Sequence, residues 1–210
     1  MHITRTANAG VLLELDGVKI LLDGVCRAGK VYLGTPDSLR ARLEQQAPDV
    51  VAVTHAHEDH FDAVYAAFYA RATGRRVLTP DTAEPAKAGD VTVTPVPSRH
   101  IGGAGKTVAH VSYVVKGSQT VWFMGDAAPT QWRGKNLPKP DVIIVPYAYA
   151  NTPTSWAATQ SFGAKDVVLV HLPDRESDPY GLWDAVLAAT AGAQATRLHI
   201  PAIGETIALP

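Results

Sequence analysis

The sequence predicts an α/β (α+β) fold of four layers, an αββα sandwich in which two mixed β-sheets pack face to face and helices flank them on the outside. Two observations favour it. Short apolar runs typical of strands recur through both halves of the chain, and segments with helical spacing of apolar residues lie between them. A doubly wound single sheet contains the same elements, so composition and spacing alone leave both architectures open.

The first half opens with a β-hairpin, because two apolar runs, 11–15 and 18–22, flank Asp16-Gly17, a dipeptide that readily adopts the positive φ of a tight turn. Pro36 and Asp37 suit the first turn of a helix that we expect to run to about Gln46. A β-loop-α-β unit follows, and its expected elements are a short buried apolar strand at 50–54, a helix from 61 to about 71 that ends near Gly74, and a strand at 76–79.

The second half repeats the alternation of strands and helices. Its expected strands are 91–96, a hairpin of 108–116 with 120–124, buried strands at 142–145 and 167–170, and a final strand pair at 197–199 and 205–208. Its expected helices are 155–162 and 180–191. No linker or internal repeat divides the chain, so we expect one domain over residues 1–210.

Composition excludes several classes of protein. Nineteen basic and twenty acidic residues leave a net charge of −1, which provides no basic surface for nucleic acid or an anionic membrane. Cys26 is the only cysteine, so no intramolecular disulfide can form. The first residues lack an apolar signal region, and no run of about 18 apolar residues could span a bilayer. We therefore expect a cytoplasmic location.

One cluster of residues has the types and spacing of metal ligands. His55, His57, Asp59 and His60 lie within six residues, directly after an expected buried strand. Alternate residues of an extended segment point the same way, so His55 and His57 can bind one metal ion while Asp59 and His60 face a second. Imidazole and carboxylate ligands suit zinc, and also iron or manganese. A purely polar loop at a strand end would not concentrate so many ligands.

The cluster matches the His-x-His-x-Asp-His motif, and here the sequence resembles the metallo-β-lactamase fold superfamily. Further family landmarks occur in order along almost the whole chain: Ile20–Asp23, Pro97–His100, Phe123–Asp126, Leu169–His171 and Gly204–Ile207. The resemblance implies the αββα fold and a site for two divalent metal ions. It assigns His55, His57 and His100 to the first ion, and Asp59, His60 and His171 to the second, with Asp126 bridging both.

Each later ligand has a structural alternative. Asp126 follows an apolar strand and precedes Ala127, where turn aspartates are common, but the cluster favours a ligand role. His110 competes with His100 for the first ion; we favour His100, because His110 lies within an alternating strand. Asp23 is expected to orient a ligand histidine by accepting its second N–H.

A site of this kind predicts a hydrolase. A water bound by two metal ions ionises near neutral pH, so a bridging hydroxide could cleave a small ester, lactone or phosphodiester, and Asp59 could carry a proton to the leaving group. The chain has no Gly-x-Ser-x-Gly motif, and Cys26 has no neighbours typical of a reactive cysteine, so the sequence gives no sign of covalent catalysis. The alternative is a metal-binding or iron redox protein on the same fold, without hydrolysis.

The substrate is expected to be a small molecule. The layout resembles the small branch of the superfamily that contains ascorbate-phosphate-lactonase-like proteins, but that branch often carries Gly-His where this chain has Ala7-Asn8, so its substrate is not transferred. Segments 146–153 and 131–133 are candidate pocket walls, with core positions as the alternative. Arg99 could meet an anionic group, and the glycine-rich residues 102–105 could form a lid.

Overall fold

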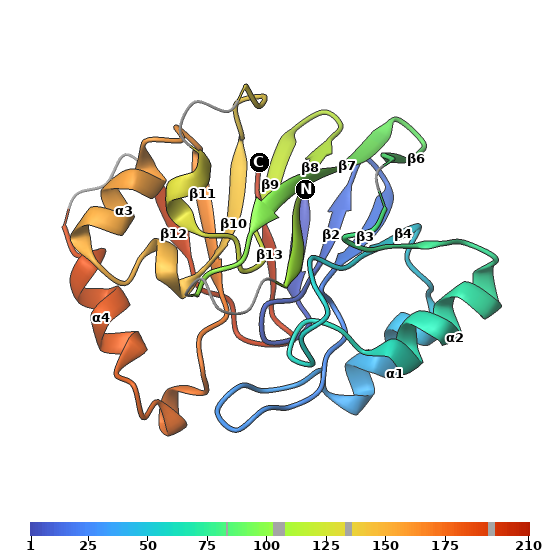
Figure 1. Ribbon diagram of the computed structural model, residues 1–210, viewed down its shortest axis with the longest axis horizontal. Helices are drawn as coiled ribbons and strands as arrows, with labels where there is room; N and C mark the ends of the chain where they lie inside the picture. The colour runs from blue at the N-terminus through green and yellow to red at the C-terminus, as the bar shows by residue number, and fades with distance from the viewer. Residues whose placement is uncertain (83, 103–107, 133–135, 193–195) are drawn as a thin grey trace.

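The computed structural model describes residues 1–82, 84–102, 108–132, 136–192 and 196–210. Within these residues two mixed sheets face each other, with helices on both outer sides (Figure 1). The first sheet has six strands in the order β13-β1-β2-β3-β4-β5, and the second has seven in the order β12-β11-β10-β9-β8-β7-β6. The predicted four-layer fold is confirmed.

The elements of the first sheet come mainly from the first half of the chain. Its strands are β1 (His2–Arg5), β2 (Val11–Leu15), β3 (Val18–Leu22), β4 (Val50–Ala52), β5 (Val77–Leu78) and β13 (Thr206–Ala208). Helices α1 (Asp37–Gln45) and α2 (Ala63–Thr73) connect them. The predicted hairpin has its expected bounds, and Asp16 and Gly17 both take positive φ, 52° and 79°.

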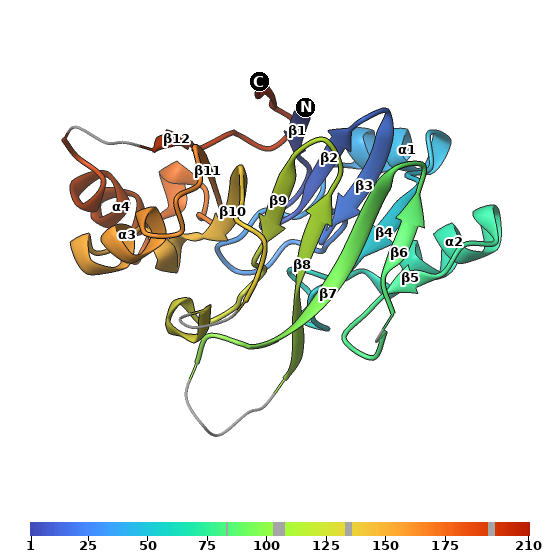
Figure 2. The ribbon, with the colours of Figure 1, turned by 90° about the horizontal axis from the view of Figure 1, so that it is seen from above.

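The second sheet is built from the rest of the chain. Its strands are β6 (Ala86–Ala88), β7 (Val91–Arg99), β8 (Ala109–Lys116), β9 (Thr120–Phe123), β10 (Val142–Pro146), β11 (Asp166–Val170) and β12 (Arg197–His199). Its helices are α3 (Pro153–Gln160) and α4 (Leu182–Ala189), with the short 3₁₀ turns Pro129–Trp132, Tyr147–Tyr149 and Arg175–Ser177. Figure 2 shows α1 and α2 beside the first sheet and α3 and α4 beside the second.

Three apolar clusters separate the four layers. The central one lies between the sheets and includes Leu13 of β2 and Phe123 of β9, each 0% exposed. Because side chains alternate along a strand, Trp122 of β9 points outward, into the cluster that also contains Trp156 of α3. On the opposite side, Tyr69 of α2 packs in the outer cluster of the first sheet.

One sequence expectation is corrected. The last two strands were expected to form a pair, but β12 is parallel to β11 in the second sheet, whereas β13 is antiparallel to β1 in the first. The chain crosses between the sheets after β12, and this crossing brings the two termini side by side, with the amino group of Met1 donating to the carbonyl of Leu209 (Figure 1). Strands β1 and β6 were not expected at all. None of the helices in the described part of the chain has the length and apolarity needed to cross a bilayer.

Candidate metal centre

The predicted cluster follows β4 and forms a compact turn before α2. The amides of His60 and Phe61 both donate to the carbonyl of His57, at 3.0 and 2.9 Å, which folds the segment back on itself. Asp62 then caps α2 by accepting from the amide of Tyr65 at 2.9 Å. The turn therefore delivers several ligand types within a few residues of one strand end.

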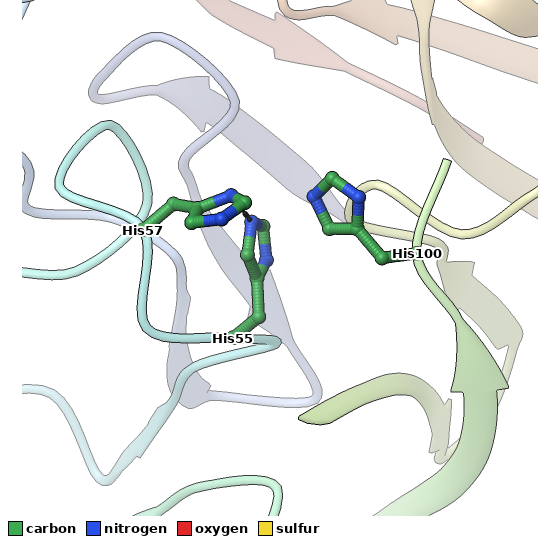
Figure 3. A group of neighbouring side chains, drawn as sticks. All are labelled: His55, His57 and His100. Carbon is green, nitrogen blue, oxygen red and sulfur yellow. Dashed lines mark hydrogen bonds between the residues drawn. The ribbon is translucent and has the colours of Figure 1, made fainter. Parts of the chain in front are cut away.

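Three histidines converge on one side of the turn. The ring nitrogens of His55, His57 and His100 lie within 4.8 Å of one another (Figure 3). His55 Nε2 and His57 Nδ1 share a hydrogen bond of 2.9 Å. His100 reaches them from the end of β7 in the other sheet, so this group joins the two sheets.

A second group lies beside the first. Ligand atoms of Asp59, His60 and His171 also lie within 4.8 Å of one another. Asp59 Oδ2 is 3.3 Å from His171 Nε2 and 3.9 Å from His60 Nε2. His171 follows β11 and takes a positive φ of 63°, a conformation that costs a histidine energy and turns it out of the strand direction.

The carboxylate of Asp126 lies between the two groups. Its Oδ2 is 3.5 Å from His100 Nε2 and 3.5 Å from His171 Nε2, and its Oδ1 is 3.5 Å from His60 Nε2. Gly125, at φ 52°, allows this placement, because a Cβ there would lie 2.6 Å from Thr54 side-chain atoms. Among the described carboxylates, Asp126 is thus the one within 4.0 Å of histidines of both groups.

Asp23 determines which ring nitrogens face the site. Its carboxylate, which can only accept, receives the Thr54 hydroxyl at 2.6 Å and His60 Nδ1 at 2.8 Å. Since the Thr54 hydroxyl donates to Asp23, its oxygen must accept from His55 Nδ1, at 3.0 Å. Both histidines therefore carry a proton on Nδ1 and turn Nε2 toward the centre. The expected orienting role of Asp23 is visible here, and it extends through Thr54 to a second histidine.

His100 and His110 differ in what their rings contact. Both nitrogens of His110 are engaged, since Nε2 accepts from the amide of Asp126 at 3.1 Å and Nδ1 donates to the hydroxyl of Ser98 at 2.8 Å. His100 Nδ1 donates to the carbonyl of Ile101, while Nε2 is buried without a hydrogen-bond partner. The geometry therefore brings His100, rather than His110, to the first group.

Burial and mutual charge determine the protonation of the site residues. Burial, together with the charge of His60, lowers the pKa of His55, and burial lowers the pKa of His110 to about 3. Burial alone would also lower the pKa of His60, but the carboxylates of Asp126 and Asp23 raise it to about 10. A cation that replaced this proton would meet the same carboxylates.

The donor set fits metal ions. Five of its buried polar atoms lack hydrogen-bond partners: His60 Nε2, His100 Nε2, Asp126 Oδ1 and both ring nitrogens of His171. Buried polar atoms are normally satisfied, so such a concentration needs a ligand. Two ligands about 2.1 Å from a tetrahedral ion lie about 3.4 Å apart, which is close to the 3.3–3.9 Å separations around Asp59 and Asp126.

The expected pocket walls divide into two kinds. The ring of Tyr147 lies 5.9 Å from that of His171, at the site. Tyr149 is fully buried and accepts from the indole N–H of Trp132 at 2.7 Å, so both belong to the outer core of the second sheet. Of the other residues expected here, Arg133 and 103–105 lie outside the described residues. Arg99 is exposed.

Sequence reasoning did not identify the contacts of Tyr32 and Asn8. The Tyr32 ring packs edge-on against His171, with centroids 4.6 Å apart, and burial and the neighbouring Tyr147 raise its pKa. The side-chain amide of Asn8 donates to Asp59 Oδ2 at 3.1 Å. No local sequence pattern predicts these contacts, because each joins the residue to a loop that is distant in the sequence.

Comparison with known proteins agrees with this geometry. Residues 2–168 match the family model described as a β-lactamase superfamily domain. The chain belongs to the metallo-β-lactamase superfamily. No curated protein matches the sequence.

Solved structures show how widely this superfamily member shares its fold. A metallo hydrolase from the hyperthermophilic archaeon Ignicoccus hospitalis has a TM-score of 0.65 at 20% identity, covering 98% of this chain and 97% of that one. An isothiocyanate hydrolase from Delia radicum gut bacteria has a TM-score of 0.67 at 17% identity, covering 100% and 99%. CmlA, a diiron β-hydroxylase from Streptomyces venezuelae, has a TM-score of 0.61 at 14% identity, covering 99% and 54%.

Proposed function

We propose that this protein is a dinuclear metal-dependent hydrolase that cleaves a small ester, lactone or phosphodiester. The observation that carries the proposal is the position of Asp126, whose two carboxylate oxygens approach histidines of both groups at 3.5 Å. A carboxylate in that position can bridge two ions. Membership of the superfamily supports a hydrolase in general.

The proposed ligands follow the two groups. The first ion is held by His55, His57 and His100, and the second by Asp59, His60 and His171, with Asp126 between them. Zinc suits this nitrogen-rich set best, and manganese and iron suit it as well. Two such ions supply an acidified water and a Lewis acid for the scissile carbonyl or phosphoryl oxygen.

The chain's own residues perform the remaining tasks. Asp59 is the proposed proton carrier to the leaving group, because its side chain is 26% exposed and so reaches solvent as well as the site. Tyr32 and Tyr147 lie beside His171 and form an aromatic wall with polar hydroxyl tips, which suits recognition of a small organic substrate. We also propose a single domain that acts on a small molecule in the cytoplasm.

Metal analysis and kinetics test this proposal together. Protein purified without chelator or histidine tag should contain about two zinc, manganese or iron ions per chain by mass spectrometry, and the metal found sets the conditions for an ester, lactone and phosphodiester screen. Turnover should be lost in Asp126→Ala and His57→Ala but kept in His199→Gln, since His199 pairs with Asp166 on β11, apart from the ligand groups. Unchanged turnover in Asp126→Ala would refute the assignment.

The second candidate is an iron-dependent redox protein on the same fold. The likeness to a diiron β-hydroxylase favours it, although at 14% identity that likeness shows the fold alone. Visible colour and an iron signal without hydrolysis of any substrate in the screen would favour this candidate.

A further inference from the structure

The turn between β1 and β2 is built directly behind the second ligand group. The amides of Thr6 and Ala7 both donate to the carbonyl of Gly10, which closes a tight turn. Ala7 and Asn8 are fully buried at its tip. A Cβ at Gly10 would collide with the carbonyl of Asp23, so only glycine allows the turn to press this closely on the Asp23 segment.

The backbone of Asn8 is fixed relative to His171. The carbonyl of Asn8 accepts from the amide of His171 at 3.0 Å and from the guanidinium of Arg5 at 2.9 Å. Arg5 is only 5% exposed, and it also donates to the carbonyls of Leu172 and Pro201, at 3.2 and 3.1 Å. A charged donor therefore holds the tip of the turn and the segment after β11 in one arrangement.

The side chain of Asn8 completes a contact with the ligand group. Its Nδ2 donates at 3.1 Å to Asp59 Oδ2, the same oxygen that lies 3.3 Å from His171 Nε2. Because an ionised carboxylate only accepts, the amide must present its N–H₂ to Asp59. Asn8 Oδ1 is then buried without a hydrogen-bond partner in the described residues, a situation that folded proteins avoid unless function requires it.

We propose that Asn8 is a positioning residue for the second metal ion: it holds Asp59 in its ligand orientation and so sets the affinity of that ion without affecting the first. This inference rests on the proposed dinuclear function. Asp59 is the most exposed side chain of the second group, at 26%, so packing alone restrains it least. The first group has no contact with Asn8 among the described interactions, so the effect is confined to one ion.

Two substitutions separate positioning from general packing. Asn8→Asp keeps the size of the side chain but faces Asp59 with a second carboxylate, and Asn8→Ala removes the contact. Asn136→Asp is the matched control, because it makes the same change at an exposed position. Chelator-stripped proteins are titrated with Zn²⁺ against a chromophoric competitor, which yields a dissociation constant for each ion, and circular dichroism records folding.

The expected result is a second-ion affinity weakened about 10- to 100-fold in both Asn8 variants, with the first-ion constant within twofold of wild type. In an Asp59→Ala background, adding Asn8→Ala should change neither constant further, because the residue it positions is absent. An unchanged second-ion constant, or equal weakening of both ions, would overturn the inference. Binding of fewer than two ions by the wild type would instead refute the proposed dinuclear function.

Discussion

Asp23→Asn should reverse the hydrogen-bond network behind both ligand groups. The aspartate accepts from the Thr54 amide at 2.7 Å, from the Thr54 hydroxyl at 2.6 Å and from His60 Nδ1 at 2.8 Å. In the variant, the asparagine oxygen keeps the amide contact and its N–H₂ faces the other two groups. His60 Nδ1 must then accept, and the Thr54 hydroxyl must donate to His55 Nδ1.

Asp23 is one of the two carboxylates that raise the pKa of His60, so the variant also favours the neutral ring. In the neutral forms, the proton of each histidine lies on Nε2, the nitrogen that faces the metal. The hydrogen bonds of these neutral forms stay satisfied, so the free energy of unfolding of the metal-free variant should change by less than about 1 kcal/mol. Metal binding must restore the original tautomers. It then leaves the asparagine N–H₂ facing a second donor at His60 and the Thr54 hydroxyl proton without an acceptor beside His55, at about 1–3 kcal/mol for each histidine. That corresponds to roughly 5- to 150-fold weaker binding of each ion.

Zinc titration against a competing chelator and urea unfolding of the stripped protein measure the two effects separately. Asp16→Asn is a close control, because Asp16 also has a positive φ and also accepts from a backbone amide and a hydroxyl, those of Ser118. Wild-type affinity for both ions in Asp23→Asn would refute the tautomer argument. A loss of several kcal/mol in the metal-free protein would show that Asp23 acts mainly on stability.

Three further perturbations have defined outcomes. Gly125→Ala should lower the free energy of unfolding by roughly 2–4 kcal/mol in urea titrations, since its Cβ would lie 2.6 Å from Thr54. The control Gly74→Ala, which has open space around it, should lower the free energy of unfolding by only about 1–2 kcal/mol, and equal losses would contradict the steric argument. Burial would raise the pKa of Asp166, but hydrogen bonds from Arg197 and His199 hold this pKa below its usual value. The difference in stability between wild type and Asp166→Asn should therefore be present at pH 7 and smaller at pH 3, and a larger difference at pH 3 would contradict this explanation. Removing metal by chelation should lower the melting temperature, because free ion at 100 times its dissociation constant adds about 2.7 kcal/mol per site; a melting temperature indifferent to added zinc would argue against bound ions.

Local sequence patterns predicted the elements whose determinants are contiguous. The hairpin 11–15/18–22 has its predicted bounds because Asp16-Gly17 specifies the turn by itself. By contrast, β1 (His2–Arg5) was not predicted. Its partners are β2 and the distant β13, and a strand of four residues carries little periodic signal of its own. The same reason explains the error at the last two strands, whose assignment to different sheets depends on pairing across nearly the whole chain.

The candidate site shows the same division. The proximity of the proposed ligands between His55 and His60 could be predicted from the sequence, because one turn supplies them all. The contacts of Tyr32 and Asn8 could not be predicted in this way. Asn8 contacts Asp59, 51 positions further along the chain, and Tyr32 contacts His171, which follows a strand of the other sheet. His110 illustrates the converse: a histidine of the right type lies next to the site, but hydrogen bonds from Asp126 and to Ser98 occupy both its nitrogens.

The distribution of the proposed ligands links metal binding to the docking of the two sheets. The turn after β4 in the first sheet supplies two histidines to the first ion and an aspartate and a histidine to the second. In each case a histidine from the second sheet, His100 or His171, completes the set, and Asp126 from the end of β9 meets both. Neither sheet alone presents more than a partial set, so the proposed ions would bind the assembled sandwich in preference to either half or to the unfolded chain. On the proposed assignment, metal would therefore stabilise the interface between the sheets. The hydrogen bonds of Asp23 and Asn8, which lie on the first-sheet side, would hold the ligands of that sheet in their binding orientation.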